Sequence, residues 1–169
     1  MKQFMLRRAG TGLLLVLVFG NSGVVRALPP PMSPEELEQK SDVVATVRVL
    51  AVACTGQVKP RGSKENVPQY QAWLQVVSAT KGSVKPKQTL LVEWHDLPRP
   101  MLLGPWKVDY FAGEEVATHL KWHEKSRNYA TTWWNAKGKP QRPADSDRLP
   151  TKPGELFVAK QLGDDGKKE

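Results

Sequence analysis

Two histidines four positions apart are the clearest candidates for metal chemistry. His119 and His123 lie in the segment Glu115–His123, where alternating apolar residues predict a strand. Every second residue of a strand shares one face, so both imidazoles could bind one copper or zinc ion. Lys121 lies between them on that face and would repel a cation. A metal site is therefore an alternative function, beside the simpler interpretation of a polar outer face with Leu120 turned inward.

A second candidate site is a pair of adjacent tryptophans, Trp133 and Trp134. Residues 129–134 predict a strand, whose neighbouring side chains point to opposite faces, so one ring should leave the core. Exposed aromatic rings anchor protein partners or stack on sugars. With Asn135, Trp106 and His95, this pair forms the predicted surface for a protein or glycan partner. The alternative is that a small protein without disulfides fills its core with large aromatics.

The sequence offers little for catalysis. His95, Asp96 and Glu93 carry groups that transfer protons, but no nucleophile accompanies them in a familiar motif. Phosphate-binding and hydrolase motifs such as G-x-x-x-x-G-K-[ST] and G-x-S-x-G are absent. The single cysteine, Cys54, excludes an intramolecular disulfide, and its apolar neighbours indicate a buried, inert thiol; a disulfide to a partner protein is the alternative. We therefore expect a non-catalytic protein without a cofactor.

Residues 1–27 predict a signal peptide. Lys2, Arg7 and Arg8 precede the apolar run 13–19, which is shorter than the roughly 20 residues that span a bilayer. Small residues then lead to Ala27, near which we expect Sec-type cleavage. The mature protein would be periplasmic or secreted, without a stable membrane anchor.

The charge of the mature chain is modest. The full chain of 169 residues carries 25 basic and 17 acidic side chains, a net charge of +8. Because four of the basic and none of the acidic residues lie in the leader, the mature chain would carry +4. Its basic residues are scattered, and an exported protein rarely meets nucleic acid, so we expect no nucleic-acid partner. The mean hydropathy of −0.46 excludes a protein with many membrane spans.

The remaining pattern predicts one short helix and several strands. Ser33, Pro34 and Glu36 form a helix start with a capping box, and we expect a helix over residues 34–40. A mainly β domain would occupy residues 28–135. Residues 136–169 would be a Pro-rich, charged, partly disordered extension in which 155–162 form a last strand or helical turn. The other predicted strands are residues 41–54, 70–80, 89–94, 106–110, 115–123 and 129–134.

The order of these signals resembles a known fold. A short helix leads into Ser41-Asp42-Val43-Val44, and Tyr70-x-Ala-x-Leu-x-Val is followed by Lys81-Gly82 and a Gly/aromatic segment at 104–110. This is similar to the netrin-like, OB-type barrel of tissue inhibitors of metalloproteinases and of small exported bacterial proteins.

The resemblance implies a small antiparallel β-barrel with a short N-terminal helix. Those inhibitors chelate the protease zinc through a mature N-terminal cysteine. Here the expected mature chain starts at Leu28 and the sole cysteine is Cys54. The inhibitory mechanism therefore does not transfer, and we expect an exported, non-catalytic binding module.

Overall fold

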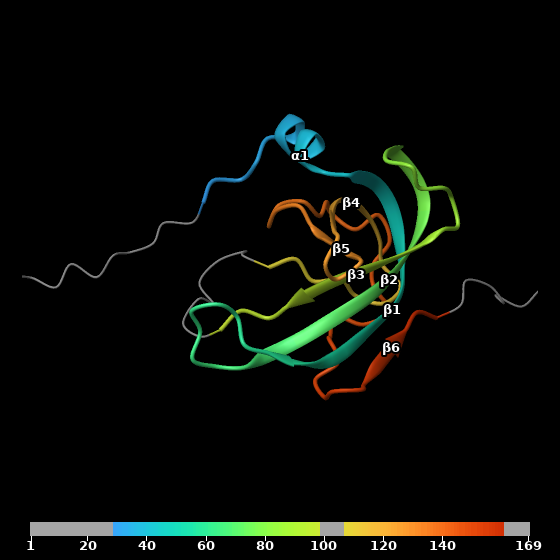
Figure 1. Cartoon of the computed structure of the whole chain (residues 1–169). Helices are drawn as coiled ribbons and strands as arrows, with labels where there is room; N and C mark the ends of the chain where they lie inside the picture. The colour runs from blue at the N-terminus through green and yellow to red at the C-terminus, as the bar shows by residue number, and fades with distance from the viewer. Residues whose placement is uncertain (1–28, 99–106, 161–169) are drawn as a thin grey trace, which may run out of the picture.

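The computed structural model describes residues 29–98 and 107–160 (Figure 1). The predicted signal peptide, its cleavage point at Ala27 and the candidate ligand residue Trp106 lie outside the described residues. The prediction of a mainly β protein with one short helix is confirmed.

The helix α1 (Pro34–Lys40) begins as its sequence predicts. The Ser33 hydroxyl accepts a hydrogen bond from the Glu36 backbone N–H at 3.2 Å, and the Glu36 carboxylate accepts one from the Ser33 N–H at 3.0 Å. This capping box satisfies two backbone donors that a helix start leaves free. Leu37 is its buried residue. Within the described ranges, no helix is long and apolar enough to cross a bilayer.

The strands agree with the predicted segments, with three differences. The first two are longer than expected, and residues 107–110 form no strand. The strand predicted over 129–134 ends at Thr131, before the tryptophan pair. The strands are β1 (Val43–Val58), β2 (Val67–Lys81), β3 (Thr89–His95), β4 (Glu115–His123), β5 (Asn128–Thr131) and β6 (Leu156–Val158).

Five strands close into a ring in the order β1-β2-β3-β5-β4, and β4 pairs back with β1. The sheet is mostly antiparallel, as expected, but it is mixed, because β3 and β5 pair in parallel through Val92 and Tyr129. Five is an odd number, so strand direction cannot alternate all the way round a closed ring, and one pair must be parallel. Strand β1 is long and bent (Figure 1), and bulges along its pairing with β2 allow that bend.

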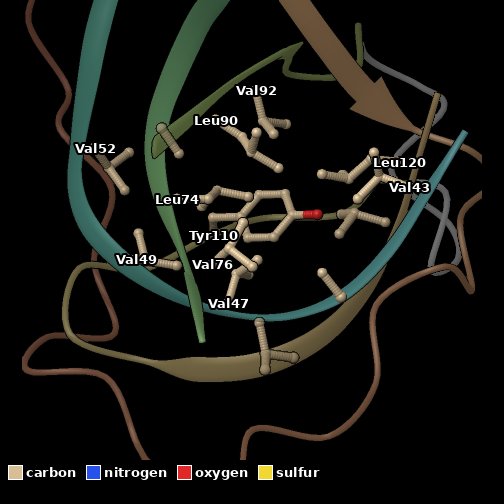
Figure 2. Packing of buried hydrophobic residues seen from close by; sticks show 14 residues of the cluster. Val43, Val47, Val49, Val52, Leu74, Val76, Leu90, Val92, Tyr110 and Leu120 are labelled. Carbon is tan, nitrogen blue, oxygen red and sulfur yellow. The ribbon is translucent and has the colours of Figure 1, made fainter. Parts of the chain in front are cut away.

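The core fills the inside of this ring. Inward residues alternate along β1, where Val43, Val47 and Val49 are almost fully buried. Figure 2 shows the Tyr110 ring in the middle of the cluster, beside Leu74. The Tyr110 hydroxyl lies 2.6 Å from the hydroxyl of Thr118, and both residues have no exposed surface. Each buried hydroxyl therefore satisfies the other.

The chain continues along the sheet after residue 135. Ala136 is buried, and its carbonyl accepts a hydrogen bond from the His119 N–H at 2.9 Å. The N–H of Gly138 donates to the Ala117 carbonyl, also at 2.9 Å. Strand β6 then pairs antiparallel with residues 51–53 of β1, which fulfils the strand alternative predicted for residues 155–162. The described part of the predicted extension is thus attached to the sheet by backbone hydrogen bonds.

Candidate functional site

A hollow of about 580 Å³ lies where β2, β3 and β5 meet the turns on either side of β5. Sequence positions far apart come together there, because β3 lies between β2 and β5 in the sheet. Its lining includes three of the predicted partner-binding residues, His95, Trp133 and Trp134. The other lining residues that carry polar or aromatic groups include Glu93, Trp94 and His123.

Glu93 supplies a fixed negative charge to the hollow. Its carboxylate accepts hydrogen bonds from the side-chain amides of Gln69 and Asn128. Asn128 is buried, and its own amide oxygen accepts a hydrogen bond from the Ser126 hydroxyl at 2.7 Å. Among the described residues, no lysine, arginine or histidine forms a salt bridge with Glu93. The carboxylate is therefore held in place by two neutral amide donors.

Trp94 lines the hollow and packs against the hydrophobic core. Its ring stacks on Tyr70 with 5.4 Å between ring centroids and meets Tyr110 edge-on at 5.6 Å. Its indole N–H donates to the Asp109 carboxylate at 3.2 Å. These three contacts fix the orientation of the indole.

Lys107 contributes a positive charge to the lining of the hollow. Its ammonium group lies 3.0 Å from the Asp96 carboxylate and 3.2 Å from that of Asp109. Burial opposes the charged form, but the hydrogen bond to Asp96 and the charge of Asp109 outweigh it and raise the pKa of Lys107. The lysine is thus committed to two carboxylates.

The structure separates the two histidines proposed as metal ligands. His123, at the exposed end of β4, lines the hollow together with His95. His119 is half-buried outside the hollow, with its Nδ1 3.2 Å from the Ala136 carbonyl oxygen. Leu120 faces the core and Lys121 is exposed, as the polar-outer-face interpretation requires. Within residues 29–98 and 107–160, no three His, Cys, Asp or Glu side chains gather closely enough to hold a metal; the copper or zinc site stays a prediction.

Trp133 and Trp134 lie in a turn, so the prediction that a strand directs them to opposite faces is wrong. The turn leaves β5 because the backbone of His119 binds both of its ends. Its carbonyl accepts from the Thr132 N–H at 3.0 Å, and its N–H donates to the Ala136 carbonyl at 2.9 Å. Residues 133–135 therefore bulge outward from the sheet, and both indoles reach the hollow.

The same turn contacts the start of the described chain. The Trp133 indole N–H donates to the Pro30 carbonyl and the Trp134 indole N–H to the Pro29 carbonyl, each at 3.2 Å. The predicted residue Asn135 does not line the hollow. Its amide is bonded instead to Met32, accepting from the backbone N–H at 3.3 Å and donating to the carbonyl at 2.9 Å.

Sequence analysis did not place Gln69, Asn128 or Trp94 in the site. They join it through the pairing of strands: Gln69 lies opposite His95 in the β2–β3 register, and Asn128 lies opposite His123 in the β4–β5 register. Strand pairing of that kind has no local sequence signal apart from the hairpin turn between β4 and β5. No protein-family model, curated protein or solved structure matches the chain.

Proposed function

We propose that the protein is an exported, non-catalytic binding module that holds a glycan in the hollow beside β3. The observation that carries the proposal is that a fixed carboxylate, Glu93, lines the same hollow as the adjacent tryptophans Trp133 and Trp134, with Trp94 between that hollow and the core. Sugar hydroxyls donate to carboxylates, and the apolar C–H faces of sugars pack on aromatic rings. The volume of about 580 Å³ lies within the roughly 300–1,000 Å³ of small-molecule sites.

We also propose that the ring of strands is an OB-type, netrin-like barrel. The ring order β1-β2-β3-β5-β4 and the bent β1, shared by β2 and β4, support this assignment. OB-type proteins bind oligosaccharides or oligonucleotides on strands 2 and 3 and on the loop between strands 4 and 5. The hollow includes Gln69 of β2, Glu93 of β3 and Ser126 of the β4–β5 turn. This support is an analogy between folds, and the chemistry of the lining carries the ligand class.

The carboxyl group in the lining of the hollow favours glycan binding over glycan hydrolysis. Most glycoside hydrolases use two carboxyl groups on either side of the scissile bond. Glu93 is the one carboxylate among the described residues of the lining. Two amides already hold it, which suits a hydrogen-bond acceptor for hydroxyl groups.

A titration with defined oligosaccharides tests the glycan site. Soluble muropeptides, chitotetraose, maltotetraose and cellotetraose would each be added while NMR follows the tryptophan indole N–H signals. We expect at least one to bind and to lose about tenfold or more in affinity with Glu93→Gln or Trp134→Ala, since each removes a central contact. Glu38→Gln, an exposed carboxylate of α1, is the matched control and should bind normally. Absence of any change with all four sugars at millimolar concentration would refute the glycan assignment.

Native mass spectrometry of protein from the exported fraction of its host tests the location. We expect the mass of residues 28–169, which corresponds to cleavage after Ala27. The full-length mass in the cytosol would contradict export. One additional copper or zinc ion, lost with His119→Ala, would favour the metal-binding alternative instead.

A further inference from the structure

The segment 29–32, which we call the arm, is bound through its backbone carbonyls, and its prolines explain why. Proline has no backbone N–H and a fixed φ, so a proline run is extended and its carbonyls lack internal partners. Those carbonyls need external donors. The indole N–H groups of Trp133 and Trp134 donate to two successive arm carbonyls. An indole N–H is a donor only, so it suits a segment that offers acceptors alone.

Asn135 recognises the first arm residue that regains an N–H. Met32 follows the proline run, and its N–H and C=O bond to the oxygen and nitrogen of one carboxamide. This two-point contact matches an extended backbone, as a neighbouring strand would. All of these hydrogen bonds reach main-chain atoms of the arm. We call Trp133, Trp134 and Asn135 the clamp. The clamp therefore recognises an extended backbone that lacks N–H groups. Any similar proline-containing segment has these two properties.

The backbone on either side of the clamp is held by the sheet. Thr132 and Ala136, which flank the clamp, are hydrogen-bonded to the backbone of His119, and the Thr132 hydroxyl lies 2.7 Å from that of Ser41. The arm supplies no residue to the buried core, and the first core residue after it is Leu37. Pro30 and Pro31 are exposed on the surface. The arm can thus leave while the clamp keeps its geometry.

We infer that the clamp is a recognition site for extended, proline-containing peptide segments. The arm is its resident ligand, and a proline-rich segment of a partner protein binds by displacing it. A short tether presents the arm at an effective concentration of about 1 mM, so a free peptide competes in that range unless it adds contacts. The clamp shares Trp133 and Trp134 with the glycan hollow, and Asn135, which contacts the arm and does not line the hollow, distinguishes the two sites.

The test uses a synthetic copy of residues 28–33, acetyl-Leu-Pro-Pro-Pro-Met-Ser-amide, and the mature full-length chain. Met32→Pro removes the N–H that Asn135 accepts and leaves the clamp unchanged. NMR of the indole N–H groups should show the peptide binding several-fold more tightly to Met32→Pro than to the unmodified chain. Adding Asn135→Ala to that variant should weaken the peptide by about tenfold, because it removes both contacts to the methionine of the peptide.

Two controls separate this site from general stickiness and from the hollow. A peptide with three glycines in place of the prolines should bind far more weakly, since it must lose the freedom that proline lacks. Glu93→Gln should leave peptide binding unchanged. If Met32→Pro unfolds α1, the unmodified chain compares the proline peptide with the glycine peptide at higher peptide concentration, where the proline peptide should bind more tightly.

Three outcomes would overturn the inference. The first is no change of the indole signals at roughly 10 mM peptide, well above the effective concentration of the arm. The second is equal binding of the glycine peptide. The third is a dimer in analytical ultracentrifugation that Asn135→Ala dissociates, because the displaced arm would then be replaced by that of a second copy.

Discussion

Two glutamates of this protein are held in opposite ways. Glu114 has 1 % of its surface exposed, and the Lys137 ammonium lies 2.7 and 2.9 Å from its two oxygens. The same ammonium donates to the Asp109 carbonyl at 2.5 Å and lies 5.2 Å from the centroid of the Tyr110 ring. Glu93 is half-buried and accepts from neutral amides alone among its described partners.

The difference separates a carboxylate that the fold neutralises from one that we propose for ligand binding. The charge of Glu114 is balanced inside the protein, so nothing from outside is needed to stabilise it. The charge of Glu93 is oriented, no cation among the described residues forms a salt bridge with it, and Glu93 lines a hollow. A carboxylate in that state can accept hydrogen bonds from hydroxyl groups without first breaking an ion pair.

The strongest test of this comparison is Lys137→Met. The change leaves Glu114 buried without its cation, and we expect the free energy of unfolding to fall by about 3–5 kcal/mol. Urea denaturation at neutral pH measures it. Lys139→Met, an exposed lysine two positions further on, is the control and should change stability by less than about 0.5 kcal/mol. A loss below about 1 kcal/mol for Lys137→Met would mean that the two glutamates do not differ in kind.

A neutral counterpart of this ion pair is the hydrogen bond between Tyr110 and Thr118. Tyr110→Phe leaves a buried hydroxyl without its partner, and unfolding should become easier by about 1–3 kcal/mol. Burial raises the pKa of Tyr110 strongly, against the smaller opposing effect of Thr118, so the phenol stays protonated and the loss should not depend on pH. Denaturation at several pH values measures both points.

The control for that hydrogen bond is the double variant Tyr110→Phe with Thr118→Val. It removes both hydroxyls, so most of the lost stability should return. A double variant as unstable as the sum of the two single variants would contradict the role given to this pair.

Glu93→Gln sharpens the comparison from the other side. An amide can still bond to Gln69 and Asn128, because their own amides can turn to offer oxygen. We therefore expect a stability change within about 1 kcal/mol, together with the loss of glycan affinity described above. Thermal and urea denaturation beside the sugar titration measure the two effects. A destabilisation as large as that of Lys137→Met would place Glu93 among the structural residues.

Features that depend on contacts between neighbouring residues could be predicted from the sequence, and features that depend on contacts between distant residues could not. The capping box of α1 and the alternation of β4 depend on neighbours within a few residues, so their patterns predicted them. The turn at Trp133 and Trp134 depends on backbone bonds to His119, a residue in another strand, and the local β-rich pattern gave the wrong direction for the side chains. The contact of Asn135 with Met32 spans 103 positions and has no local signal.

The smallest expected effect concerns a third carboxylate, Asp42, which has a cation but lies at the surface. It accepts from the Trp122 backbone N–H at 2.8 Å and from the Lys121 ammonium at 2.9 Å. The backbone hydrogen bond, followed by Lys121, holds the pKa of Asp42 below its usual value. Its stabilisation should therefore be complete at neutral pH and disappear as the pH falls through the folded-state pKa.

Asp42→Asn should remove that acid dependence and cost less than about 1 kcal/mol at pH 7, because water screens a pair whose side chains are 50 % and 43 % exposed. Urea denaturation between about pH 2 and pH 7 compares the variant with the unmodified chain, since this range covers the titration of carboxylates. If the free energy of unfolding changes equally with pH in the two chains, the contact of the Asp42 carboxylate with β4 does not affect stability. A loss as large as that of Lys137→Met would show that burial is not what separates a structural carboxylate from the others.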